Sequence, residues 1–291
     1  MADVVLYAIP GFLAALFLEA FFARRRGVQI SEGRDSAASL AMGVGSLFVG
    51  AAWAGVAYAV YTALHAHRVF EIGAGWGVFA LALLADDFAY YWFHRTHHEV
   101  RLLWASHVTH HSSQRYNYAT ALRQTWTPMT TLLFTAPLAW LGFDPLLLVT
   151  VHGVNLIYQF WIHTELIERC PAWFEWVFNT PSHHRVHHGS NPRYLDRNYA
   201  GILILWDRLF GTFEPETEPV RFGLTKNLAS YNPLQIAFHE WFAVLRDAWR
   251  AESWRTSAGH LFAPPGWLPG GARQTASDLR RAALGGEAKA A

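Results

Sequence analysis

The stretch 94–117, HRTHHEVRLLWASHVTHHSSQRYN, is unusually rich in histidine. Six of its first eighteen residues are histidine, and HHRVHH at 183–188 adds four more. The neutral imidazole nitrogen is a good ligand for Fe, Zn, Cu and Ni. Ionisable side chains in or beside a membrane are expensive and are retained mainly for function. The two histidine-rich stretches therefore predict a metal site.

The spacing of these histidines indicates how many metal ions the site holds. H-x3-H at 94–98 places two imidazoles one helical turn apart on the same face. H-x2-H-H occurs at 107–111 and again at 184–188, and one more histidine ends an apolar segment at 163. The candidate ligands are His94, His98, His107, His110, His111, His163, His184, His187 and His188. One ion takes about four to six ligands, so nine imidazoles suit two metal ions.

The remaining histidines have simpler explanations. His97 and His183 adjoin the motifs but point away from the shared faces. Isolated histidines near a membrane more often make hydrogen bonds than bind metal, and we expect this of His65, His67, His152, His239 and His260.

Other metal motifs are missing from the sequence. Glu99 and Glu240 each follow a histidine, but neither H-E pair has the second histidine of a zinc-protease motif. The Glu-x-x-His pairs of a carboxylate-rich di-iron bundle are absent as well. The single cysteine, Cys170, excludes both an internal disulfide and a cysteine-rich metal site.

The composition indicates a membrane protein. Only 15% of the 291 residues are charged, whereas soluble proteins have about 25%. Hydrophobic residues make up 52%, and there are 14 tryptophans. The net charge of +1 provides no basic field for nucleic acid, so we expect no nucleic-acid partner.

Five apolar segments are candidates for membrane helices. A helix needs about 20 apolar residues to cross the hydrocarbon core. The candidates are 4–23, 36–64, 75–93, 126–143 and 145–162. The last two are joined by a short turn and form either a spanning or a re-entrant hairpin. The first segment lacks a basic start and a cleavage signal, so we expect it to be retained.

Basic residues predict the orientation. Arg24, Arg25 and Arg26 follow the first segment and place the loop 24–36 in the cytoplasm. Counting crossings from there puts both 94–125 and 163–291 in the cytoplasm. All the histidine motifs then lie on one face of the membrane.

Two aspartates interrupt the third apolar segment. A carboxylate at membrane depth costs roughly 2.5–3.5 kcal/mol on insertion scales and is a candidate for function. Asp87 is seven residues before His94 and eleven before His98, so the three share a helix face. We expect Asp87 to accept a hydrogen bond from a ligand imidazole and to orient it. A helix-end carboxylate that reaches water or pairs with an arginine is the alternative.

The C-terminal part has a more mixed composition. Residues 232–254 combine apolar and charged positions at helical spacing, as in a helix lying in the membrane interface. From Gly270 the chain is small and polar, and we expect a disordered tail. The predicted organisation is 1–74 membrane helices, 75–215 catalytic domain, 216–269 cytoplasmic or interfacial helices, and 270–291 tail. The predicted fold class is an all-α membrane bundle with a cytoplasmic helical cap.

Four motifs resemble the fatty acid hydroxylase superfamily, also called the sterol desaturase family. They are DDFAYYWFHRTHHE, HVTHHSS, NTPSHHRVHH and NYAGILILWDRLFGTF. The resemblance covers about residues 75–215 and implies a membrane-embedded di-iron oxygenase that hydroxylates or desaturates lipids. It implies that the nine histidines bind two Fe ions and that O₂ and an external reductant are consumed.

Within the family, YNYATALRQ and YQFWIHTELI most resemble the branch that cleaves ether lipids of the alkylglycerol type with tetrahydrobiopterin. Glu99 also matches that branch and is a candidate catalytic residue beside Asp87. Where relatives have H-x3-H before the last motif, this chain has Gln159-x3-His163, so only His163 carries over. An electron-transfer protein is the alternative reductant.

Three other functions remain open. A hydroxylase or desaturase acting on a sterol, carotenoid or fatty acid would carry the same motifs. A membrane metal transporter is a more distant possibility, since transporters place their ligands near the bilayer midplane. A metal-storage protein is equally distant.

The predicted topology can be tested with a reporter fused after Gly270. The arginines after the first helix predict a cytoplasmic signal at that position. A signal from the opposite side of the membrane would overturn the count of crossings.

Overall fold

The computed structural model describes residues 4–271 and 274–290, with side chains up to 285. Within these ranges the chain is helical, and the only extended pairing consists of isolated bridges between Phe178 and Leu203 and between Gly189 and Phe222. The predicted all-α class is confirmed for this part of the chain.

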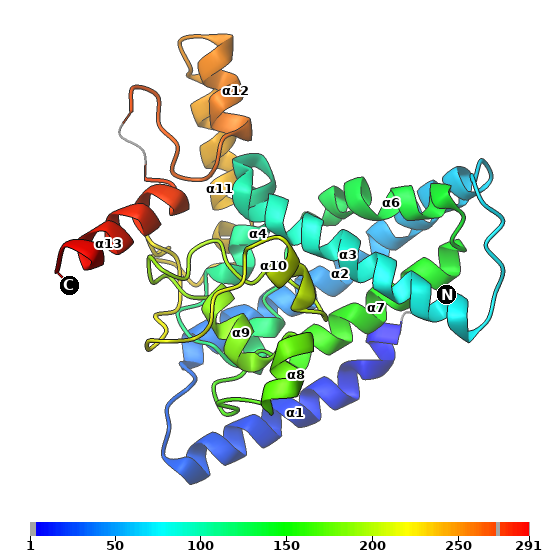
Figure 1. Cartoon of the computed structure of the whole chain (residues 1–291), viewed down its shortest axis with the longest axis horizontal. Helices are drawn as coiled ribbons and strands as arrows, with labels where there is room; N and C mark the ends of the chain where they lie inside the picture. The colour runs from blue at the N-terminus through cyan, green and yellow to red at the C-terminus, as the bar shows by residue number, and fades with distance from the viewer. Residues whose placement is uncertain (1–3, 272–273, 291) are drawn as a thin grey trace.

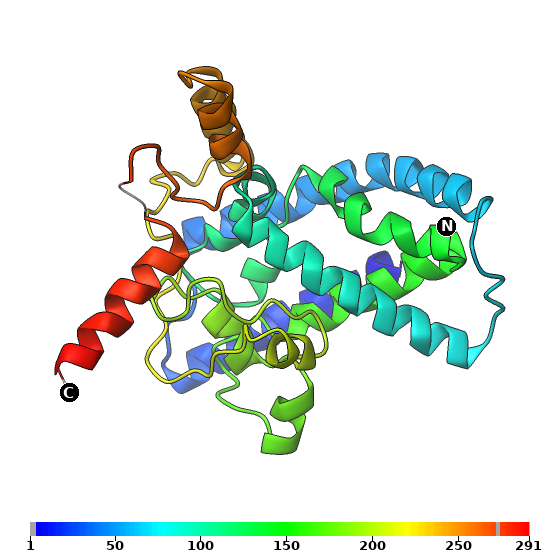
Figure 2. The same ribbon diagram turned by 45° about the horizontal axis from the view of Figure 1, so that its top comes forward.

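Four long helices and the shorter α6 run side by side and form the body of the molecule (Figures 1 and 2). They are α1 (Val4–Arg26), α2 (Gly33–His65), α3 (Trp76–Glu99), α6 (Leu132–Leu141) and α7 (Pro145–Trp161). α3 packs on α7 and α6, α2 packs on α6, and α1 packs on α7. The start of α1, the α2–α3 connection and the α6–α7 turn gather at one end, which we call the far end.

Two of these helices are long and apolar enough to cross a membrane. They are α1 and α2, which have 23 and 33 residues. α3 has 24 residues, but Asp86 and Asp87 lie in its middle. The segment 126–143 forms a 3₁₀ turn, η1 (Pro128–Thr131), followed by the ten residues of α6. At 1.5 Å per residue α6 is about half the length needed to cross the hydrocarbon core.

Small residues allow the helices to approach closely. The core between α2, α3, α6 and α7 contains Ala82, Ala89 and Ala139 beside larger side chains such as Tyr61 and Leu148. In helix pairs surrounded by lipid, small residues increase the contact between backbones and hence the van der Waals attraction. Close packing of α3 on α7 sets the distance between the histidines at their ends.

The other elements gather at the opposite end of the bundle, which we call the site end (Figure 1). They are α4 (Arg101–His111), α5 (Tyr118–Ala121), α8 (Ala172–Val177), α9 (Pro181–His187), α10 (Leu205–Leu209), α11 (Pro233–Trp249) and α12 (Trp254–Phe262). α11 packs on α4 and α12. The pair α11 and α12 projects sideways from the bundle (Figure 2).

Where composition predicts a disordered tail, the structure has helix α13 (Ala276–Ala290). Alanine, which is abundant there, has the highest helix propensity. Thr275 is buried and its hydroxyl accepts from the amide of Asp278, which caps the first turn. Arg280 then donates to the Arg193 carbonyl and anchors this turn to the site end.

A buried ion pair joins α2 to the site end. The side chains of Arg123 and Asp35 are 2% and 6% exposed, and their charged atoms lie 2.7 Å apart. Arg123 also donates to the hydroxyls of Ser39 and Ser112, so its guanidinium spans α2 and the turn after α4. These bonds compensate the desolvation of both charges.

Replacing Arg123 by Met would leave the Asp35 carboxylate buried without its counter-charge. Breaking such a pair on one side costs about 3–5 kcal/mol. We expect a loss of this size in the free energy of unfolding, measured by denaturant titration in detergent micelles.

The matched control is Arg68→Met. Arg68 pairs with Glu71, whose side chain is 82% exposed, and such surface pairs contribute about 1 kcal/mol or less. Equal losses in the two variants would show that burial does not give the Asp35–Arg123 pair its importance.

Candidate metal centre

The nine histidines singled out by their spacing form two compact groups at the site end. The first group, group A, consists of His94, His98, His107, His111 and His187. The second, group B, consists of His110, His163, His184 and His188. Within each group every histidine offers one ring nitrogen, and these nitrogens all lie within 4.8 Å of one another. The groups are neighbours, since the rings of His111 and His188 stack at 4.4 Å.

Helix geometry explains why single motifs supply both groups. On α4, His107 and His111 are four residues apart and share a face, whereas successive residues differ in direction by 100°. His110 therefore points to group B while its neighbour points to group A. The α9 motif divides in the opposite sense, with His184 and His188 in group B and His187 in group A. The two H-x2-H-H motifs thus link two adjacent centres.

Backbone carbonyls fix the orientation of several rings. The Nδ1 of His94 lies 2.7 Å from the Tyr199 carbonyl, and that of His187 lies 2.9 Å from the Arg197 carbonyl. In group B, the Nδ1 of His163 lies 2.7 Å from the Gln159 carbonyl. A carbonyl oxygen can only accept, so each Nδ1 carries the proton and each Nε2 carries a lone pair.

The lone pairs point at one another. The Nε2 atoms of His163 and His110 lie 3.1 Å apart, although both Nδ1 atoms face backbone carbonyls. Nε2 of His184 approaches that of His163 to 3.0 Å, and Nε2 of His188 has no hydrogen-bond partner among the described residues. Two neutral acceptors at this separation repel each other unless a cation lies between them. The donor set therefore fits a metal ion, and all the ligands that the described residues offer in the two groups are imidazole nitrogens.

Burial keeps the imidazoles neutral. Desolvation and the neighbouring imidazoles lower the pKa of His107, His111, His184 and His188 well below the usual value for histidine. Desolvation lowers the pKa of His110 to about 4 and of His187 to about 3. Neutral imidazole is the form that binds metal, so these rings need not lose a proton before binding.

The structure corrects the direct contact expected between Asp87 and a ligand imidazole. Asp87 accepts from the amides of Ile202 and Leu203 at 2.7 and 3.0 Å, and from the indole N–H of Trp206 at 2.9 Å. These bonds hold the segment that carries the Tyr199 carbonyl, the partner of His94. Two backbone amides and one indole N–H from the segment 202–206 thus take the place at this buried carboxylate that was expected for an imidazole.

Asp86 has partners on α7. Its carboxylate lies 3.1 Å from Nδ1 of His152 and accepts from the side-chain amide of Asn155 at 3.0 Å. Asp86 and Asp87 together tie α3 to α7 and to the segment 199–206. The two acidic residues hold the scaffold around the histidines.

Glu99 lies at the rim of the site. Its carboxylate accepts from Arg95 at 2.9 Å, and its side chain is 41% exposed. His97 and His183 lie outside both groups: His97 bonds the Phe93 carbonyl and the Thr130 hydroxyl. The side-chain amide of Gln159 donates a hydrogen bond to Asn155. The backbone carbonyl of Gln159 accepts one from Nδ1 of His163.

Sequence reasoning missed Asp207 and Tyr199, which support group A. Asp207 accepts from the amides of Tyr199 and Ala200, both at 2.8 Å, and burial raises its pKa to about 6. The Tyr199 ring lies 5.4 Å from that of His98. Asp207 could have been noticed because it is the one acid in the apolar run NYAGILILWDRLFGTF.

Replacing Gly201 by Ala should disturb this support. A Cβ there would meet Asn155 Oδ1 at 2.6 Å and Asp87 Oδ1 at 2.8 Å, closer than real Cβ contacts. Overpacking of this kind costs about 1–3 kcal/mol. We expect lower thermal stability of the variant. We also expect faster hydrogen exchange at the amides of Ile202 and Leu203, because these amides donate hydrogen bonds to Asp87.

Gly50→Ala is the control, because nothing lies within 4 Å of a Cβ built there. It should leave both measurements unchanged or slightly raise stability. Unchanged exchange at Ile202 and Leu203 in Gly201→Ala would contradict the role given to Asp87.

Comparisons with known proteins agree with the motifs. The family description "Fatty acid hydroxylase" matches residues 79–212. The chain is 48% identical over 191 residues to an alkylglycerol monooxygenase from Homo sapiens, covering 65% of this chain and 42% of the relative. It is 43% identical over 240 residues to that of Xenopus tropicalis, covering 81% and 53%.

A more distant relative acts on another lipid. The chain is 29% identical over 161 residues to an ornithine lipid hydroxylase from Rhizobium tropici, covering 54% of this chain and 48% of the relative. The chain spans about half the length of the curated relatives named here. No solved structure gives a significant match.

Proposed function

Because residues 79–212 of the chain belong to the fatty acid hydroxylase family, we propose that the protein is a membrane-bound di-iron monooxygenase that hydroxylates a C–H bond of a lipid. The observation that carries the proposal is the pair of buried imidazole groups, five and four strong, with nitrogen lone pairs facing inward. The nine ligands would hold two ions in one chain.

Two iron ions in groups A and B would activate O₂, so that one oxygen atom enters the lipid and the other is reduced to water. The chain's own residues prepare this chemistry by positioning and exclusion. Backbone carbonyls hold the rings of His94, His163 and His187 in one tautomer. Burial keeps water from the centre, which protects a reactive oxidant from side reactions.

We propose an alkylglycerol-type ether lipid as substrate. The proposal rests on the relatives named alkylglycerol monooxygenase, at 48% and 43% identity. Hydroxylation of the carbon next to the ether oxygen gives a hemiacetal, which breaks into an aldehyde and a free alcohol. The reaction consumes O₂ and two electrons, so it needs an external donor, for which tetrahydrobiopterin and an electron-transfer protein are the candidates.

In this proposal residues 75–215 are the catalytic domain and 1–74 anchor it in the membrane, with the histidine groups on the cytoplasmic face. Residues 216–269 lie along the membrane surface. Exposed aromatic side chains on α11 and α12 suit that position: Phe242, Trp249 and Trp254 are 72%, 91% and 76% exposed. In this proposal Asp87 and Glu99 do not bind metal. They position the residues that surround the histidine groups.

The reaction can be tested with protein in lipid nanodiscs, loaded with iron under anaerobic conditions and supplied with hexadecylglycerol, tetrahydrobiopterin and isotopically heavy O₂. The hydroxylation route predicts hexadecanal that carries the heavy oxygen when trapped at once by reduction, and unlabelled glycerol. Heavy oxygen in glycerol would contradict hydroxylation at the hexadecyl carbon next to the ether oxygen. Absence of O₂ uptake stimulated by hexadecylglycerol would contradict the ether-lipid substrate.

The ligand assignment predicts distinct losses of iron. His98→Ala and His110→Ala remove one imidazole from group A and group B, so each should lower the iron content and abolish turnover. Loss of a partner outside the ligand set typically costs about 10–100-fold, and loss of a ligand should cost more.

His67→Ala is the control, since His67 is exposed and lies outside both groups. Its iron content, measured by metal analysis after anaerobic purification, should equal that of the unmodified protein. Equal losses in His67→Ala and His110→Ala would refute the assignment.

A further inference from the structure

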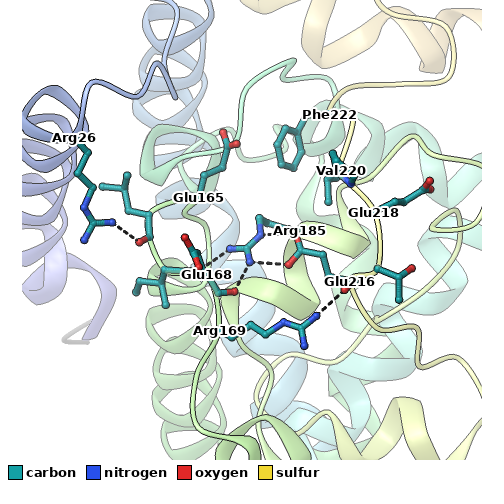
Figure 3. Close-up of a pocket in the computed structure, with 13 residues that line it drawn as sticks. Arg26, Glu165, Glu168, Arg169, Arg185, Glu216, Glu218, Val220 and Phe222 are labelled. Atoms are coloured by element: carbon teal, nitrogen blue, oxygen red, sulfur yellow. Dashed lines mark hydrogen bonds and ion pairs between the residues drawn. The ribbon is translucent and has the colours of Figure 1, made fainter.

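A large cavity lies beside the histidine groups, and none of their residues lines it. Its volume is about 1200 Å³. The end of α1, the loop after His163, α9 and the segment 216–222 line it (Figure 3). Charged side chains dominate the lining, so an acyl chain does not suit it. The cavity suits a small polar molecule.

Most of the positive charge around this cavity is already used to build its wall. Arg185 forms two bonds of 2.9 and 2.7 Å with the Glu216 carboxylate and donates to the carbonyls of Thr164, Ile167 and Glu168. Because Arg185 lies in α9 between His184 and His187, its bonds also hold the loop after His163 against that helix. The same Arg185 hydrogen bonds therefore build the wall of the cavity and fix the position of the group B histidines.

Glu165 provides a free acceptor. Its carboxylate lines the cavity and accepts no hydrogen bond from a described residue (Figure 3). Arg185 and Arg115 are close enough to act on it through charge. Glu165 is half-buried, so its carboxylate can accept from an N–H or O–H group of a molecule bound in the cavity.

An aromatic bridge connects the cavity to group B. Phe222 lines the cavity, and its ring stacks on Tyr116 at 4.9 Å with the planes 8° apart. The Tyr116 ring, which is fully buried, lies 5.6 Å from that of His163 and 5.1 Å from that of His188. Only two rings therefore separate a molecule stacked on Phe222 from two ligand imidazoles.

The bridge is held in place at each end. The Tyr116 hydroxyl donates to the Ile162 carbonyl at 2.9 Å, next to His163. Phe222 pairs with Gly189 in an isolated antiparallel bridge, directly after His188. Both rings are thus fixed by the residues that flank the ligands of group B.

We propose that this cavity is the electron-entry site, where a small reduced heterocycle with N–H donors binds Glu165, stacks on Phe222 and delivers its electrons through Phe222 and Tyr116. The proposal rests on the monooxygenase function above, which requires two electrons per turnover. The donor DH₂ is oxidised to D and releases two electrons and two protons. Overall, RH + O₂ + DH₂ gives ROH + D + H₂O, with both protons ending in water.

The experiment separates donor binding, reduction of the centre, and chemistry on the lipid. Tetrahydrobiopterin is the probe, and calorimetry under anaerobic conditions measures its binding to metal-free and iron-loaded protein. Stopped-flow absorbance then follows reduction of the oxidised iron centre by the same donor. A single turnover of protein reduced in advance with dithionite bypasses the cavity.

Glu165→Gln removes the charged acceptor but keeps its size, and should weaken binding about tenfold, because a hydrogen bond to a charged acceptor is stronger than one to a neutral amide oxygen. Phe222→Leu removes the ring and should slow reduction about tenfold at saturating donor, whereas Phe222→Tyr should reduce at the unmodified rate. All three variants, once reduced with dithionite, should form product like the unmodified protein.

Phe174→Leu is the matched control, because Phe174 also stacks on a neighbour, Phe178 at 4.7 Å, but does not line the cavity. It should change neither binding nor reduction. Unmodified binding in Glu165→Gln together with unmodified reduction in Phe222→Leu would overturn the proposal. So would a donor that fails to bind the unmodified protein, or reduction only by a reduced ferredoxin. Absence of product after dithionite reduction would instead count against the monooxygenase, while binding and reduction still decide the electron-entry site.

Discussion

Lone-pair repulsion among buried imidazoles governs this structure. His110 and His163 bring two unprotonated Nε2 atoms to 3.1 Å, and the Nδ1 protons of both are held by backbone carbonyls. Protonation would relieve the repulsion only by burying a positive charge, which desolvation opposes. A metal cation satisfies the lone pairs without that cost. Metal binding would therefore stabilise the site end of the molecule.

The scaffold must hold the rings against that repulsion. Asp87 and Asp207 each accept two backbone amides of the segment 199–203, and this segment in turn presents the carbonyl that orients His94. Arg123 and Asp35 perform a similar task between α2 and the turn after α4. Buried polar bonds that involve none of the nine histidines thus fix the segment beside His94 and the turn after α4.

The candidate ligands and the all-α class could be predicted from the sequence because both depend on local spacing. The division of the ligands into two groups was not predicted, since it depends on how α3, α4, α7 and α9 converge. Asp87 was expected to bond an imidazole because it shares a helix face with His94. Its actual partners come from a loop more than a hundred residues later in the chain, which periodicity cannot reveal. Asp207 bonds nearby residues, but it supports the site because one of them, Tyr199, presents its carbonyl to His94, more than a hundred residues earlier in the chain.

The central claim is that groups A and B hold two iron ions side by side in one chain. Mössbauer spectroscopy of iron-57-enriched protein, combined with metal analysis, tests it most directly. The account predicts two iron ions per chain, in two nitrogen-ligated sites. One iron per fully active chain would contradict it.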